Sequence, residues 1–426
     1  MGFGSVLKNG FTRRRFMKGA LFGAGAVATG SAWAVQEIAQ AMATGKKAGD
    51  VRGYGVEPGR VNIGSNENPL GASPRAVAAI AENLHKINRY DFGVDLPVRL
   101  NKMHDVPGVE GFELSFEDMR SFMRFRELNR VMVTPGSGPI LQALAVMAAS
   151  DGGECIEAVP GYGSVARGFQ SFQMMGKDVS VVRVPTTGDF VHDLSAMKAA
   201  ITPKTSLIVV TNPNNPTGTI VPYDELVSLV DAAPEQAIVL IDEAYIHFVR
   251  DPNYQDAVKL ALERENVVVA RTFSKIYGLA GMRIGYAVGG QRMMNMLMAH
   301  MGFFGGGLST LGMHAALAAI DDVEFVDRTL KVVNDGKDYL SAEFDRLGLE
   351  YTPSHGNYMI VNIGRDSRRM SGALFRRGVM VRSGSGYRTR EVDLLGNHLR
   401  VTIGKPDELE VFVNELEDIL GGSSQG

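Results

Sequence analysis

Short runs of apolar residues, separated by helical stretches, are the feature that most constrains how this chain folds. From Val131 onward the runs lie at residues 131–133, 153–159, 179–185, 205–213, 237–245, 266–273 and 283–290. Most of these runs are continuously apolar rather than alternating, which is typical of strands buried on both faces. Strands that alternate with helices predict an α/β fold. We therefore expect a mainly parallel, seven-stranded sheet flanked by helices.

A second, smaller α+β domain is expected beyond this pattern. After Asp322 the chain shows long helical stretches and only a few strand-like runs, at residues 358–364, 379–384 and 398–404. Residues 61–90 begin with a turn-rich stretch and continue into a helical one. The predicted organisation assigns 1–34 to a signal peptide, 35–60 to a lead-in, 61–90 and 322–420 to the small domain, and 91–321 to a large cofactor-binding domain.

Composition narrows the function classes. The chain of 426 residues has a formal net charge of -3 and no long basic block, so nucleic acid is not an expected partner. Its single cysteine, Cys155, excludes an intrachain disulfide. The sequence contains neither C-x-x-C nor H-E-x-x-H, so no metal site is expected.

The N-terminus has the features of an export signal. Arg13, Arg14 and Arg15 precede an apolar Gly/Ala-rich segment that ends in a small-x-small site, either at 32–34 or at 41–43. This arrangement resembles a twin-arginine signal peptide, which implies passage through the twin-arginine translocation machinery to the periplasm. The segment is too short and too rich in glycine for a permanent membrane span. The alternative is an amphipathic or disordered tail.

Polar side chains follow three neighbouring apolar runs at the points where the expected strands end. Asn215 follows the run at 205–213, Asp242 and Tyr245 end the run at 237–245, and Lys275 follows the run at 266–273. In a parallel sheet the carboxyl ends of the strands share one edge, so these groups should converge. An amine, a carboxylate, a phenol and an amide suit pyridoxal phosphate, which needs a Schiff-base lysine and a carboxylate at its ring nitrogen.

The remaining parts of a site for this cofactor are also present. Gly136, Ser137 and Gly138 lie between an expected strand and helix, where backbone N–H groups can bind a phosphate. Hydroxyl groups and a guanidinium for the same phosphate come from Thr272, Ser274 and Arg283. The ring of Tyr162, at another strand end, can stack on the cofactor. Taken singly, each residue has a structural alternative, such as a solvated strand end for Lys275.

At this point the chain resembles a fold-type-I pyridoxal-phosphate aminotransferase of the class I/II group, most of all the histidinol-phosphate aminotransferase branch. The matching blocks are SNENPLGASP, TNPNNPTGT, IDEAY, RTFSKIYGLAGMRIGY and NHLRVTIG. The resemblance implies that Lys275 bonds the cofactor and moves protons, and that Asp242 pairs with the ring nitrogen. It further implies that Asn215 and Tyr245 bind the ring oxygen, and that Ala244 packs under the ring.

The resemblance also implies roles for residues outside the strand ends. Arg400 matches an arginine that binds the substrate α-carboxylate, Asn357 a residue near the substrate, and Tyr90 a tyrosine that a partner subunit donates. An active homodimer would follow. Arg382 is a candidate for an anionic substrate group. The sequence departs from the family around the substrate, for example at 301–310, so neither the amino donor nor the acceptor is readable.

Two other functions stay open at this level. A decarboxylase, a lyase or a racemase can use the same cofactor and fold, and the sequence does not separate these reactions from transamination. A fold without activity that serves as a binding protein is the other alternative. The presence of Lys275 together with Asp242 argues against it.

Overall fold

The structure is a computed structural model that describes residues 61–89, 95–113, 118–302, 307–387 and 393–422. The expected signal peptide and lead-in, and Tyr90, lie outside these residues. Within the described part of the chain, no helix combines the length and the apolar character needed to cross a membrane.

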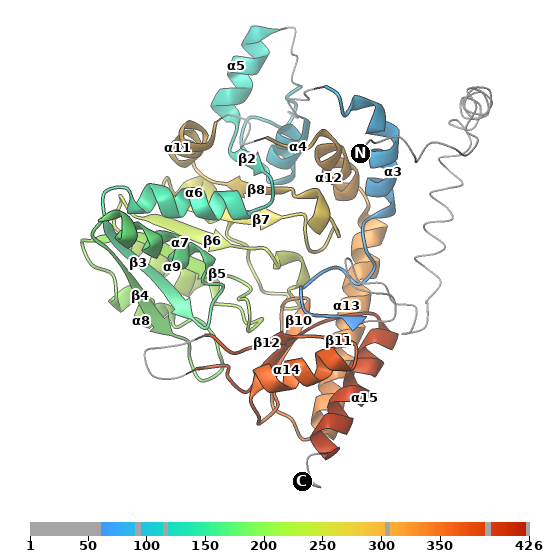
Figure 1. The fold of residues 1–426 in the computed structure, drawn as a ribbon. Coiled ribbons are helices and arrows are strands. Elements are labelled where there is room, and N and C mark those ends of the chain that lie inside the picture. Colours follow the sequence, from blue (N-terminus) through green and yellow to red (C-terminus); the bar gives the residue numbers. More distant parts are fainter. Residues whose placement is uncertain (1–60, 90–94, 114–117, 303–306, 388–392, 423–426) are drawn as a thin grey trace, which may run out of the picture.

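A seven-stranded sheet forms the centre of the larger part of the molecule (Figure 1). Strand β8 is antiparallel to both of its neighbours, β2 and β7, and the other neighbouring strands run parallel. The expected mainly parallel sheet of seven strands is therefore confirmed. In order across the sheet, the strands are β2 (Val131–Thr134), β8 (Gly285–Val288), β7 (Val267–Thr272), β6 (Ile238–Asp242), β5 (Thr205–Thr211), β3 (Gly153–Val159) and β4 (Val179–Pro185).

Helices bury both faces of this sheet. Successive side chains of β5 enter opposite cores, with Leu207 in one and Ile208 in the other. This explains why the strand is apolar at every position, because neither face meets water. One core includes α6 (Gly138–Ala149), α7 (Ser164–Gln170) and α11 (Gln291–Met301); the other includes α8 (Leu194–Ala199), α9 (Tyr223–Ala232) and α10 (Val258–Glu263).

A second, antiparallel sheet lies below the first in Figure 1 and packs with the C-terminal helices. A two-stranded parallel pair joins β1 (Val61–Asn62) to β11 (Val379–Met380), which brings the start of the described chain to its C-terminal part. The strand order of the second sheet is β12 (Arg382–Ser383), β13 (His398–Thr402), β10 (Tyr358–Asn362) and β9 (Tyr351–Thr352). The helices are α13 (Val323–Arg346), α14 (Ser367–Arg376) and α15 (Pro406–Gly422).

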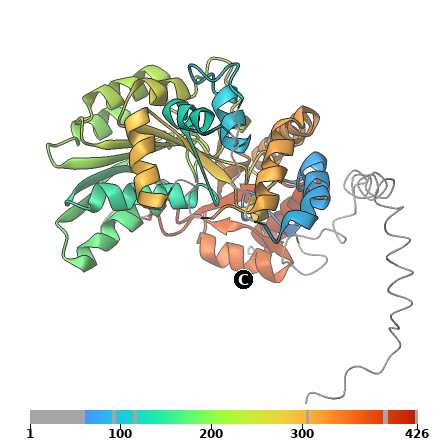
Figure 2. The ribbon, with the colours of Figure 1, turned by 90° about the horizontal axis from the view of Figure 1, so that it is seen from above.

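Four further helices lie beside the large sheet. In Figure 2, α3 (Pro74–Asn83) lies alongside α12 (Thr310–Ile320), and α4 (Asp95–Met103) also contacts α12. A charged segment of the chain forms α5 (Met119–Leu128), with Asp118 as its N-cap. The predicted small domain includes both β1 and α3. Strand β1 pairs with β11 of the same domain, whereas α3 packs against α12 of the predicted large domain. The domain boundaries stay a prediction.

The turn after Lys275 packs tightly against the loop that precedes α3. Gly278 has a φ of +68°, and an added Cβ would lie 1.8 Å from the carbonyl oxygen of Gly71. We expect Gly278→Ala to lower the free energy of unfolding by about 2–5 kcal/mol, because the left-handed backbone and the collision both cost energy. Urea unfolding of the cofactor-free protein measures this difference.

A second glycine separates the cost of the left-handed backbone from the cost of the collision. Gly176 has a φ of +77° and nothing within 4 Å of an added Cβ, so Gly176→Ala isolates the backbone contribution of about 1–2 kcal/mol. Equal losses in the two variants would contradict the close packing of the Gly278 turn on Gly71.

Candidate active site

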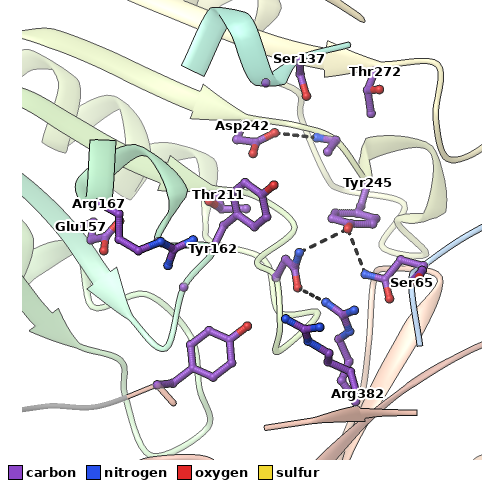
Figure 3. Close-up of a pocket in the computed structure, with 18 of the residues that line it drawn as sticks. Ser65, Ser137, Glu157, Tyr162, Arg167, Thr211, Asp242, Tyr245, Thr272 and Arg382 are labelled. Carbon is purple, nitrogen blue, oxygen red and sulfur yellow. Dashed lines mark hydrogen bonds between the residues drawn. The ribbon is translucent and has the colours of Figure 1, made fainter. Parts of the chain in front are cut away.

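A cavity of about 770 Å³ lies at the carboxyl ends of the central strands, where the large sheet meets the second one (Figure 3). Strands β5, β6 and β7 contribute Thr211, Asp242 and Thr272 to its wall. Arg382 and Arg400 enter from β12 and β13 on the opposite side. The edge of a parallel sheet is where ligands bind in this class of fold.

Asp242 and Lys275 lie at the centre of this cavity. The Asp242 carboxylate is almost fully buried, with 5% of the residue exposed, and accepts a hydrogen bond from the Ala244 N–H at 3.2 Å. The Lys275 Nζ donates to the carbonyl oxygens of Asn66 at 3.0 Å and of Ser65 at 3.4 Å. Strands β6 and β7 are neighbours in the sheet, with Asp242 opposite Ala270, and Lys275 follows β7, so both groups reach the same cavity.

Burial favours the uncharged form of both side chains and so shifts both pKa values toward 7. It raises the pKa of Asp242 from 3.8 to about 6, because a carboxylate loses its hydration there. Burial, followed by the positive charge of Arg400, lowers the pKa of Lys275 from 10.5 to about 8. An amine with this pKa is partly neutral near pH 7, as a nucleophile and a proton carrier must be.

A hydrogen-bonded chain links the phenol of Tyr245 to Arg400. The Asn215 amide donates to the Tyr245 hydroxyl at 3.3 Å, and its carbonyl accepts from the Arg400 Nη1 at 2.8 Å. The Arg400 Nη2 donates to the Gly64 carbonyl at 2.8 Å. Asn66 also donates to the Tyr245 hydroxyl, at 2.9 Å. The guanidinium is thereby fixed in the wall, and its Nε is buried without a hydrogen-bond partner among the described residues.

The turn between β2 and α6 forms a cradle together with Arg283. An added Cβ on Gly136 would lie 2.3 Å from the Arg283 Nη2, so only glycine allows the guanidinium to approach this turn. Arg283 itself has a φ of +54°, a strained conformation for a residue with a side chain. Its Nη1 lies 3.4 Å from the Ser274 hydroxyl, which accepts from Thr272 at 2.9 Å. Ser137 makes no side-chain capping bond to α6.

These groups fit pyridoxal phosphate. The cradle offers a guanidinium, three hydroxyl groups and the start of a 12-residue helix, which together suit a phosphate. The amine of Lys275 and the carboxylate of Asp242 lie in the same cavity, as the aldehyde and the ring nitrogen require. The donor set thus has one partner for each polar part of the cofactor.

The structure brings most of the predicted site residues to one cavity. Those that line it are Ser137, Gly138, Tyr162, Asn215, Asp242, Ala244, Tyr245, Thr272, Ser274, Lys275, Arg283, Arg382 and Arg400. Gly136 lies directly beneath, against Arg283. Tyr90 lies outside the described residues, so its role stays a prediction.

Asn357 is the exception among the described candidates. It does not line the cavity; it is fully buried, and its amide donates to the Glu67 carbonyl at 3.1 Å. Its role near the substrate therefore stays a prediction. Its backbone carbonyl accepts from the Ile403 N–H at 2.9 Å, which holds it behind the loop at 64–68.

Sequence reasoning missed several residues of the cavity wall. Asn66 lies in the SNENPLGASP block, which marked the family but suggested no contact with Lys275 or Tyr245. A run of turn-forming asparagines was the available signal. Glu157, Arg167 and Tyr387 also line the cavity (Figure 3 labels the first two). They come from a strand, a helix and a loop in which no motif singled them out.

Comparison with known proteins places this site in a family. Residues 58–416 match the family described as aminotransferase class I and II. A histidinol-phosphate aminotransferase of Moorella thermoacetica is 37% identical over 363 residues, which are 84% of this chain and 85% of that protein. A histidinol-phosphate aminotransferase of Brevibacillus brevis is 34% identical over 367 residues, or 85% of this chain and 91% of that protein.

Solved structures show the same fold. The histidinol-phosphate aminotransferase of Sinorhizobium meliloti, solved in complex with pyridoxal 5'-phosphate, aligns with a TM-score of 0.72 and 23% identity, covering 85% of this chain and 91% of that one. The family match extends over nearly all of the described chain. The chain therefore belongs to the aminotransferase class I and II family and is a transaminase that uses pyridoxal phosphate.

Proposed function

We propose that this transaminase moves an amino group between an amino acid, or a histidinol-phosphate-like amine, and a 2-oxo acid by ping-pong chemistry on Lys275. The observation that carries the proposal is one cavity that holds the Lys275 amine, the Asp242 carboxylate and the Arg400 guanidinium together. The curated relatives described above are histidinol-phosphate aminotransferases, which supports an amine of that kind as one candidate substrate.

Each part of the reaction has a residue suited to it. When bound, pyridoxal phosphate supplies an aldehyde that an amine can hold and a protonated ring that withdraws electrons from the substrate Cα. Asp242 keeps the proton on the ring nitrogen. Lys275 Nζ would take the proton from the substrate Cα and return it to the cofactor carbon on the far side of the substrate nitrogen. The Asn66 carbonyl accepts a hydrogen bond from this Nζ at 3.0 Å, which helps to orient the amine.

Other residues bind and orient the cofactor and the substrate. Asn215 and Tyr245, which are hydrogen-bonded to each other, hold the ring oxygen, and Tyr162 stacks on the ring. Gly136, Ser137, Gly138, Thr272, Ser274 and Arg283 hold the phosphate. Arg400 grips the substrate α-carboxylate with its planar guanidinium, since Asn215 and Gly64 already fix its orientation. Arg382 accommodates an anionic substrate group.

A panel of amines tests this proposal directly. The purified enzyme, loaded with cofactor, is mixed with single amino acids and with histidinol phosphate, and the cofactor's absorbance and the products are followed. The proposal predicts a 2-oxo acid, or the corresponding carbonyl compound, together with cofactor that keeps the amino group. Release of carbon dioxide, or racemised amino acid, would instead support the alternative activities on the same fold.

We also infer a homodimer in which Tyr90 of each subunit reaches the partner's cofactor phosphate. The proposal rests on the resemblance, and on Leu84 and Ile87, which precede Tyr90 and are 52% and 68% exposed. Apolar side chains exposed together indicate a contact surface. Sedimentation of the loaded enzyme as a monomer would overturn it.

The lowered pKa of Lys275 has a measurable consequence. Only the neutral amine attacks an aldehyde, so the rate of cofactor capture should rise with pH and level off above about 8, where Lys275 has lost its proton. With an ordinary lysine, the rate of capture would keep rising until the pH approached 10.5. Stopped-flow absorbance with the cofactor-free protein measures this profile. A rate still climbing steadily beyond pH 9 would contradict the shifted pKa.

We further propose that the protein is exported to the periplasm by the twin-arginine route. Support comes from Arg13 and Arg14 ahead of an apolar segment. Changing both to lysine should leave the precursor in the cytoplasm, because that route reads the arginine pair as an address. Cell fractionation followed by immunoblotting measures the distribution, and lysine at Arg15 alone is the matched control. Unchanged export of the double variant would refute the proposal.

A further inference from the structure

Three charged residues in the cavity wall have no part in the function proposed so far. Glu157, Arg167 and Arg183 line the same cavity as Lys275, on the side of β3, β4 and α7. Glu157 on β3 and Arg183 on β4 are register partners in the parallel pair. Charged side chains directed into a substrate cavity are candidates for specificity, because they must be matched by the ligand.

Glu157 is the anchor of this group. The residue is 6% exposed, and its Oε1 lies 3.9 Å from the Arg183 Nε. Burial raises the pKa of Glu157 to about 7, while Arg183 and then Arg167 act to lower it. One buried carboxylate therefore faces two guanidinium groups. It can balance one of them, which leaves positive charge on this wall.

The position of Arg167 is set by the turn at the start of α7. Gly163 precedes the helix with a φ of +67°, and an added Cβ there would lie 2.8 Å from the Arg167 Nη1. The absence of a side chain lets the guanidinium lie over the turn beside Tyr162. In Figure 3 this guanidinium points toward the middle of the cavity, next to Tyr162, whereas Glu157 lies behind it.

The opposite wall also carries positive charge and a phenol. Arg382 and Tyr387 line the cavity from β12 and the loop after it. Burial raises the pKa of Tyr387, while Arg400, Arg382 and Arg167 act to lower it. The phenol thus lies within the electrostatic reach of guanidinium groups from both walls. Arg167 and Arg382 consequently face the same volume from opposite sides.

The cavity keeps an excess of positive charge after the cofactor and the substrate α-carboxylate have taken their partners. Arg283 is matched by the cofactor phosphate and Arg400 by the α-carboxylate. Among the described residues that line the cavity, Arg167, Arg183 and Arg382 then stand against Glu157, three cations against one anion. Like charges in a partly enclosed cavity repel, and a bound anion relieves that repulsion. A guanidinium and a hydroxyl from opposite walls are suited to oxygen atoms of a carboxylate or a phosphate.

We propose that Arg167, backed by Glu157, is a specificity-determining residue that forms with Arg382 and Tyr387 a subsite for a second anionic group on the substrate side chain. This inference rests on the proposed function, since it assigns the distal part of the same substrate site. The shared chemistry of the ligand is an oxyanion on the side chain, either a carboxylate or a phosphate ester.

Selectivity between matched donors tests the subsite. Four forms of the loaded enzyme are assayed: the wild type and the variants Arg167→Gln, Arg167→Lys and Arg292→Gln. Each form is given two pairs of amino donors, glutamate and glutamine, and O-phosphoserine and serine. Arg292 is an exposed arginine on α11 whose Nη1 lies 4.0 Å from Glu235, and it serves as control. Arg167→Gln should lower the anionic-to-neutral ratio of kcat/KM about 10- to 100-fold. Arg167→Lys should restore part of it, and Arg292→Gln should leave it unchanged.

A binding measurement removes the chemistry from the test. Glutarate and butyrate cannot react, and their Kd values for the loaded enzyme follow from the shift in cofactor absorbance. Glutarate should bind the wild-type enzyme more tightly than butyrate, and Arg167→Gln should abolish most of that difference. The glutamate pair and the O-phosphoserine pair show which oxyanion the subsite prefers.

The outcomes separate the subsite from the proposed function. Wild-type enzyme that transaminates but does not prefer anionic donors would overturn the subsite and leave the function standing. Equal losses for anionic and neutral donors in Arg167→Gln would reduce Arg167 to a structural residue. Enzyme that takes no amino group from any donor would instead refute the proposed function.

Discussion

Lys275→Ala should lower turnover at least about 10⁴-fold, because it removes both the amine that bonds the cofactor and the proton carrier. The cavity still offers Asp242, Arg283 and the turn at Gly136, so the variant should retain weakened cofactor binding. Steady-state kinetics of the loaded variant and equilibrium dialysis of the cofactor measure the two effects.

Another buried lysine provides the control. Lys337 on α13 is 3% exposed, donates to the Ser354 carbonyl at 3.1 Å and lies outside the cavity. Burial lowers the pKa of Lys337 to about 7, so it shares the shifted proton affinity of Lys275 without its position. Lys337→Met should keep turnover close to that of the wild type. Full activity in Lys275→Ala, or its loss in Lys337→Met alone, would contradict the assignment.

Asp242→Asn should lower turnover about 10³-fold, since a neutral amide cannot hold a proton on the ring nitrogen. The loss should appear in kcat with the fold intact. Asp242→Glu, which keeps the charge on a longer side chain, should recover part of the rate. Steady-state kinetics of both variants, together with the absorbance of bound cofactor, measures this.

The stability of the cofactor-free Asp242→Asn variant distinguishes a functional from a structural role. Burial raises the pKa of Asp242 to about 6, so the ionised carboxylate is disfavoured in the folded state. Below its unfolded pKa of 3.8 the carboxyl group is neutral in both the folded and the unfolded state. As the pH rises through about 6, the cost of burying the ionised carboxylate in the folded state develops fully. At pH 7.5 the amide should therefore leave the free energy of unfolding equal or raised. A marked loss of stability would assign Asp242 to the scaffold.

Much of the large sheet could be predicted because its strands are buried on both faces. The runs at 205–213 and 237–245 are apolar at nearly every position, and they form β5 and β6. Asp242 ends β6 and Lys275 lies shortly after β7, so the sequence order placed both at one edge of the sheet. Strand β8 runs antiparallel to β7, because the short connection from Thr272 to Gly285 contains no crossover helix.

The rest of the site depends on contacts between distant parts of the chain. The carbonyl of Asn66 reaches Lys275 across 209 positions of sequence, and local patterns contain no trace of such a contact. Arg167 and Arg382 face each other only after the large and the small sheet are packed together. The burial of Asn357 also depends on such contacts, because its amide donates to the carbonyl of the distant Glu67.

Mapping the attachment of the cofactor tests the central claim most directly. The loaded enzyme is reduced with borohydride, which makes the bond between cofactor and amine permanent, and its peptides are then examined by mass spectrometry. The account predicts the cofactor on the peptide that contains Lys275, and none on Lys337. A cofactor attached to another lysine, or a protein that retains none, would contradict it.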